Sequence, residues 1–95
     1  MEKVIFEKLK YGDKLVTFGN DGTIKYYTYL CREPNREKYH CLLLQEDYMS
    51  VIFSSPFDVE KMFIHQNYGE TTDYSNKVRA KYYKDWLEEY SWQHK

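Results

Sequence analysis

Two cysteines and a histidine have the clearest chemical potential in this chain. Cys31, His40 and Cys41 fall on two stretches that are typical of neighbouring strands. If the hairpin between them pairs residue 32 with 40, the two cysteines face each other, and if it pairs 32 with 39, Cys31 faces His40. A zinc site normally needs four ligands at tight spacing, such as C-x2-C pairs, and the sequence has none. We therefore expect two buried, reduced thiols, no metal and no cofactor.

The sequence also lacks a catalytic constellation. His40 and Cys41 are adjacent, and adjacent residues of a strand point to opposite faces of the sheet, so they cannot serve as nucleophile and base to each other. The acidic residues are not paired as acid–base hydrolysis requires. The glycine-rich stretch 19–22 is short and precedes a strand, whereas a phosphate loop precedes a helix. We predict that the protein is not an enzyme.

The most suggestive cluster is Lys25, Tyr27 and Tyr29, because alternate residues of a strand share one face. If that face is exposed, the tyrosines could anchor a protein partner, or they could stack on nucleic-acid bases while the lysine meets phosphate. The other interpretation is that the final helix covers this face with Trp86 and Tyr90.

A polar segment over 65–74 is the second candidate surface. It is expected to be a loop of about ten residues, a length that is often functional. Tyr68 and Tyr74 lie in it. Together with Lys25, Tyr27 and Tyr29 of the strand 23–32, they are predicted to contact a partner.

The amino-acid composition favours a protein-binding function over a nucleic-acid-binding one. Of its 95 residues, 19% are aromatic, including 11 Tyr, which is more than one small core needs. The net charge is −1 and only three of the 14 basic residues are Arg, which disfavours a strong nucleic-acid binder. Lys, Tyr, Phe, Ile and Asn have AT-rich codons, so their abundance favours an origin in a low-GC bacterium or its mobile elements.

The elements expected from hydrophobic pattern and turn residues give a single α+β domain over 1–95. They are strands at 3–11, 14–18, 23–32, 39–45 and 48–53, a short helix near 56–64 and a long C-terminal helix near 76–91. Ser55 and Pro56 are a helix start, and Ser75 or Asn76 is expected to cap the last helix. The apolar stripe of that helix is Ala80, Tyr83, Trp86, Leu87 and Tyr90, with Val78 and Tyr82 to one side.

Strands joined by short turns form an antiparallel meander, and a sheet that is apolar on both faces must curl or be covered. The segment 9–63 resembles small SH3-like or Tudor-like barrels. The resemblance lies in the opening Leu9-x-x-Gly12-Asp13-x-Leu15, in the Tyr-rich strand that follows, and in the short helix directly after the last strand. The resemblance implies a small barrel of about five strands. We use it for the fold alone and infer no ligand from it.

We expect a cytoplasmic protein, because charge interrupts the N-terminal apolar stretch after three residues and no run approaches a membrane span. The leading functional hypothesis is a small protein-binding inhibitor or adaptor of the mobile-element type that blocks a bacterial host protein. The alternatives are a single-stranded nucleic-acid-binding barrel and a structural subunit of a homo-oligomer, such as a homodimer.

Overall fold

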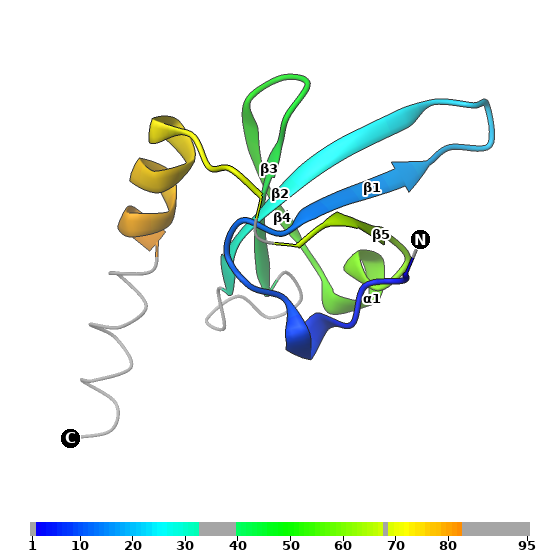
Figure 1. The fold of residues 1–95 in the computed structure, drawn as a ribbon, viewed down its shortest axis with the longest axis horizontal. Coiled ribbons are helices and arrows are strands. Elements are labelled where there is room, and N and C mark those ends of the chain that lie inside the picture. The colour runs from blue at the N-terminus through cyan, green and yellow to red at the C-terminus, as the bar shows by residue number, and fades with distance from the viewer. Residues whose placement is uncertain (1, 33–39, 68, 83–95) are drawn as a thin grey trace.

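The computed structural model describes residues 2–32, 40–67 and 69–82, which form one five-stranded sheet with short helices around it (Figure 1). The elements are η1 (Phe6–Lys8), β1 (Lys14–Phe18), β2 (Ile24–Arg32), β3 (Cys41–Gln45), β4 (Ser50–Ser54), α1 (Pro56–Val59), β5 (Phe63–Gln66) and a final helix over 73–82. The spatial order is β4-β3-β2-β1-β5, and all neighbours are antiparallel. This confirms the α+β class and the antiparallel sheet. Over the described residues the sheet is open, with β4 and β5 at its edges.

The β1–β2 hairpin follows from its turn residues. Gly22 adopts a φ of 85°, which is costly for a residue with a side chain, and Asp21 accepts hydrogen bonds from both the amide and the hydroxyl of Thr23. The two strands pair from Phe18 opposite Ile24, next to the turn, to Lys14 opposite Thr28. The turn therefore fixes which side chains share a face.

Two sequence predictions about the edge of the sheet were wrong. Residues 3–11 are not a strand: they form the 3-10 helix η1 and one isolated bridge between Lys3 and Phe63, because the buried side chains of Phe6 and Leu9 are spaced for a helical turn. The predicted helix near 56–64 ends at Val59, and the chain continues as β5, which includes the first residues of the predicted loop.

β5 forms because its neighbours on both sides complete its hydrogen bonds. It pairs with β1 on one side, and on the other the amide of Ile64 donates to the carbonyl of Glu2 at 2.7 Å. The amide of Val4 donates to the carbonyl of Met62 at 3.0 Å. The N-terminal segment thus covers this edge of the sheet, a pairing between distant parts of the chain that local sequence pattern does not reveal.

One face of the sheet carries the larger of two apolar cores. The N-terminal segment and α1 lie over this face and contribute to the core (Figure 1). Its buried residues are Val4, Phe6, Leu9, Leu15, Tyr27, Tyr29, Cys41, Leu43, Val59 and Met62. Full burial of each large side chain stabilises the fold by about 1.5–3 kcal/mol, so this core dominates the apolar contribution.

The final helix covers only part of the opposite face. Val78 and Tyr82 pack against a smaller core of Leu30, Cys31, Leu42 and Leu44. The ring of Tyr82 meets that of Phe53 edge-on, with centroids 5.6 Å apart. Ala80, predicted to lie on the docking stripe, is exposed. Within the described residues, the helix therefore packs on the sheet through Val78 and Tyr82, which the sequence analysis placed to one side of the apolar stripe.

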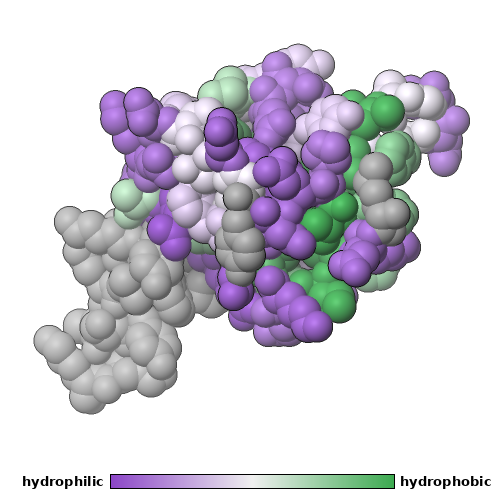
Figure 2. All heavy atoms as spheres, viewed as in Figure 1, coloured by the Kyte–Doolittle hydropathy of each residue, from purple (hydrophilic) through white to green (hydrophobic). Residues whose placement is uncertain are grey.

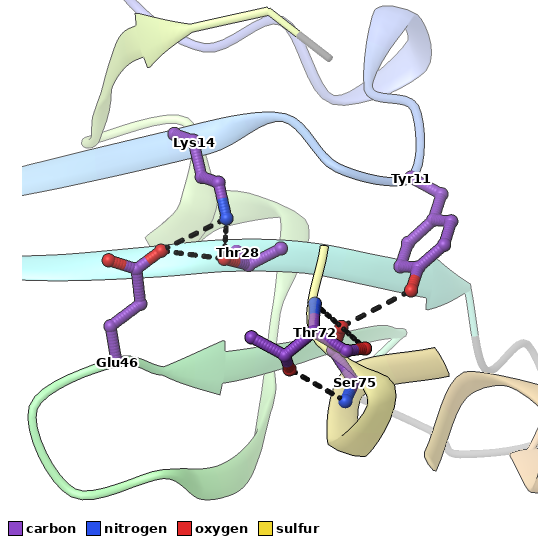
Figure 3. A network of polar contacts seen from close by, with 6 residues as sticks. All are labelled: Tyr11, Lys14, Thr28, Glu46, Thr72 and Ser75. Carbon is purple, nitrogen blue, oxygen red and sulfur yellow. Dashed lines mark hydrogen bonds and ion pairs between the residues drawn. The ribbon is translucent and has the colours of Figure 1, made fainter. Parts of the chain in front are cut away.

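The final helix begins earlier than predicted. Thr72 caps it: its hydroxyl accepts from the amide of Ser75, whose own hydroxyl accepts from the amide of Thr72, both at 3.0 Å. Tyr11 holds this first turn, because its hydroxyl lies 3.2 Å from the hydroxyl of Ser75 (Figure 3). The same Tyr11 hydroxyl donates to the side-chain oxygen Oδ1 of Asn76. Residues 83–95, with Trp86 and Tyr90, lie outside the described residues, so the predicted extent of the helix to residue 91 stays a prediction.

Candidate functional site

The structure does not present the predicted tyrosine cluster as an exposed platform. Tyr27 is 8% exposed and Tyr29 is 3% exposed, and both belong to the larger core. Burial raises the pKa of Tyr29 above its usual range. Only Lys25 is exposed. The N-terminal segment and α1 cover the tyrosines, whereas the described part of the final helix packs on the other face. Trp86 and Tyr90, the alternative cover in the sequence analysis, lie outside the described residues.

The second predicted surface is partly placed. Tyr74 is 45% exposed in the first turn of the final helix, and Tyr68 lies outside the described residues. His65 belongs to β5 and not to a loop. Tyr74 therefore stays a candidate contact residue, apart from the tyrosines of β2.

The cysteines do not meet in either predicted way. A register shift between Tyr29 and Cys31 places Cys31 opposite Leu42 and Arg32 opposite Cys41, so the two cysteines enter different cores. Burial raises the pKa of Cys41 to about 12. Within the described residues, no group of three His, Cys, Asp or Glu side chains could hold a metal ion.

The strongest candidate surface lies on the face that the final helix covers only in part. Figure 1 shows that helix at the opposite end of the sheet from the tip of the β1–β2 hairpin. The side chains on the uncovered half, which we call the hairpin patch, are Phe18, Ile24, Tyr26, Phe63 and His65. Phe18 and Ile24 face each other across the hairpin, and Tyr26 and Phe63 flank Val16 from either side.

The hairpin patch is exposed, and four of its rings lie against one another in two pairs. Phe18 is 51% exposed, Ile24 46% and Tyr26 36%. The rings of Phe18 and Phe63 lie 5.8 Å apart, and those of Tyr26 and His65 lie 5.5 Å apart. Figure 2 shows hydrophobic residues along the side of the molecule that carries this hairpin. Contiguous exposed apolar side chains of this kind mark an interaction surface.

Figure 3 shows a charged network of Lys14, Thr28 and Glu46. It borders the hairpin patch, because Lys14 and Glu46 line the same depression as Tyr26 and His65. The ammonium of Lys14 donates to the Thr28 hydroxyl at 2.8 Å, and that hydroxyl donates to Glu46 Oε1 at 2.7 Å. Lys14 Nζ also lies 3.2 Å from the same carboxylate oxygen. Thr28 is 1% exposed, so its hydroxyl is a buried link between two partly exposed charges.

Gly69 holds the lysine of this network in place. A Cβ added at Gly69 would lie 2.7 Å from Lys14 Cε and 2.8 Å from Cγ, so the lysine stem runs directly along the glycine backbone. The amide of Gly69 in turn donates to the carbonyl of Gly12 at 2.7 Å, just before β1. The loop before the final helix is thereby fixed against the start of β1.

A depression of about 540 Å³ lies beside the network and the hairpin patch. It is lined by Lys14, Tyr26, Glu46, His65, Gln66 and Glu70. Tyr26 and His65 belong to both the depression and the hairpin patch, so one partner could occupy both. The exposed apolar side chains of Ile5, Tyr48, Met49 and Phe57 are not part of the hairpin patch or of the depression's lining.

The sequence analysis assigned the binding role to the face of β2 that carries Lys25, Tyr27 and Tyr29, whereas Ile24 and Tyr26 of the other face are the exposed ones. The alternation identifies two faces and does not say which of them the rest of the chain covers. The exposed set includes Phe63 and His65, whose strand was not predicted. The adjacent apolar residues Phe63 and Ile64 were the sequence signal that could have indicated this strand.

No family model, curated protein or solved structure matches this chain. Among the described residues no helix is long and apolar enough to cross a membrane.

Proposed function

We propose that this chain is a non-enzymatic protein-binding module that uses the hairpin patch as its contact surface. The observation that carries the proposal is the half-covered sheet face: the final helix packs on Leu30 and Leu42, whereas Phe18 and Ile24 remain exposed at the other end. Aromatic anchors of this kind contribute most of the binding energy in protein interfaces.

The hairpin patch lies largely on two interior strands of the sheet and over a buried side chain. Val16, between Tyr26 and Phe63, is 1% exposed, and β1 and β2 beneath the patch are both interior strands of the sheet. A preorganised surface loses little side-chain freedom on binding, so more of the contact energy appears as affinity. Lys25, at the exposed end of the same hairpin, would lie at the rim of such an interface.

Binding of a single-stranded nucleic acid is the second candidate, because several rings of the patch are exposed and Lys3 Nζ lies 5.7 Å from the centroid of Phe63. The carboxylates of Glu46 and Glu70 beside the patch disfavour a phosphate backbone. A mixed-sequence oligonucleotide that binds at micromolar concentration near physiological salt, and stops binding on Tyr26→Ala, would favour this second candidate.

The wider biological role belongs to the same proposal. A small chain of this composition fits a cytoplasmic inhibitor or adaptor of the mobile-element type that occupies the surface of a bacterial host protein. Its AT-rich residue usage supports a low-GC origin. We also propose that the sheet curls toward a small SH3-like barrel, which is supported by the short helix after β4 and by the return of β5 to β1.

The test is affinity capture from a low-GC bacterial lysate with paired variants. Phe18→Ser/Ile24→Ser removes the centre of the hairpin patch at exposed positions, so the fold should persist, as circular dichroism would verify. Phe57→Ser is the matched control, since Phe57 is 71% exposed outside the patch. A partner retained by the unmodified chain and by the control, and lost on the patch variant, is expected. Partners retained equally by all three would refute the proposed surface.

A further inference from the structure

We infer that the depression beside the hairpin patch accepts a lysine or arginine side chain of the bound protein. The inference rests on the proposed function, because it assigns the chemistry of the residue next to the apolar anchor of the partner. The lining combines two carboxylates, from Glu46 and Glu70, with the rings of Tyr26 and His65.

The carboxylates leave acceptor capacity for a cation. Glu46 receives both Thr28 and Lys14 on the single oxygen Oε1, so among the described residues its Oε2 has no partner. The Glu46 side chain is 38% exposed. Glu70 is exposed and forms no ion pair with any residue that the structure describes. Two acceptors thus face one depression with only one lysine to balance them.

The lysine of the lining does not favour an anionic ligand instead. Lys14 is fixed between the Thr28 hydroxyl and the Gly69 backbone, and its side chain is only 18% exposed. Its charge is already directed at Glu46. An incoming carboxylate or phosphate would therefore meet the free oxygen of Glu46 and the charge of Glu70, and like charges repel.

The aromatic rings complete the selection for a cation. Tyr26 is 36% exposed, and its ring is tilted by 59° relative to that of His65. A guanidinium or ammonium within about 6 Å of a tyrosine ring is attracted to its face. Because Tyr26 also belongs to the hairpin patch, a partner residue with an apolar side chain on Phe18 and Ile24 would place its basic neighbour at the depression.

The test uses a phage-displayed library of random peptides, selected against the 95-residue chain. We expect peptides with a Lys or Arg beside an aromatic or aliphatic residue, and we expect their binding to disappear on Phe18→Ser/Ile24→Ser. Selection on Glu46→Gln/Glu70→Gln should keep the apolar residue and lose the basic one.

The matched control is Glu2→Gln/Glu60→Gln, which removes the same charge at exposed positions outside the depression and should keep the basic preference.

Isothermal titration calorimetry with one selected peptide then measures the contribution of the cation. Replacing its basic residue by Gln should weaken binding to the unmodified chain about five- to tenfold. The same replacement should weaken binding less than about threefold on Glu46→Gln/Glu70→Gln, because only the attraction to the Tyr26 ring remains there. Peptides that need the hairpin patch but show no basic preference would overturn this inference and leave the proposed function standing. Peptides that bind regardless of the patch variant would overturn both.

Discussion

Thr28→Val tests the buried link between Lys14 and Glu46. Valine has nearly the same shape as threonine, so the change removes a hydroxyl without opening a cavity. The lost contacts are the bonds at 2.8 Å from Lys14 and 2.7 Å to Glu46, each with a charged partner. A bond to a charged group contributes about 1.5–3 kcal/mol when buried.

The net cost is smaller than the sum of two such bonds. Lys14 and Glu46 remain 3.2 Å apart after the change, and their side chains are 18% and 38% exposed, so water replaces part of what is lost. We expect the free energy of unfolding to fall by about 1–2 kcal/mol. Each kcal/mol lowers the melting temperature of a domain this small by about 4–8 °C.

Urea denaturation followed by circular dichroism measures this change, with an unaltered m-value as evidence that the fold is retained. Thr17→Val is the matched control, because Thr17 is on the neighbouring strand and its hydroxyl has no hydrogen bond to a described residue; its effect should stay within about 0.5 kcal/mol. Equal stability of Thr28→Val and the unmodified chain would show that the network contributes nothing net to folding.

Three further changes probe other parts of the structure. Gly69→Ala should displace the Lys14 side chain and lower the melting temperature, and it should cost less in a Lys14→Ala background; equal costs in both backgrounds would show that Gly69 does not act through the lysine. Burial raises the pKa of Cys41 to about 12, whereas an unfolded thiol titrates near about 8.5. The unfolded chain therefore loses that proton first, and the free energy of unfolding should fall as pH rises from 9 to 11, with a smaller slope in Cys41→Ala; an unchanged slope in urea titrations would contradict this. Tyr82→Ala removes the ring that meets Phe53 at 5.6 Å and should destabilise the fold by about 1–3 kcal/mol without changing binding at the hairpin patch, as calorimetry would verify.

Local residue chemistry was sufficient to predict the middle of this fold. The turn ending at Gly22 fixes the β1–β2 hairpin, and the strand predicted at 39–45 forms as β3, whose residues 41–44 are buried. Ser55 caps α1 through the amide of Asp58 at 3.1 Å, with Pro56 in the first turn. In each case neighbouring residues supply both the signal and the contact, so the sequence pattern contains what is needed.

The remaining features depend on residues far apart in the chain. β5 exists because Glu2 and β1 complete its hydrogen bonds, and neither is close in sequence. The burial of Tyr27 and Tyr29, and not of Tyr26, depends on the N-terminal segment covering one particular face. The register shift near Cys31 reverses the face expected from simple alternation. The candidate site was missed for the same reason.

The late position of β5 has a consequence for synthesis on the ribosome. β1 to β4 are joined by consecutive hairpins and can pair as they emerge, but the outer edge of β1 must wait for β5, which follows after most of the chain. At about 5–20 residues per second that interval lasts several seconds. During it, an unpaired strand edge and the ring of Phe18 are accessible to chaperones and to other nascent chains. Slower translation through the segment before Phe63 should therefore lower the yield of native protein, an effect that leaves the stability of the finished fold unchanged.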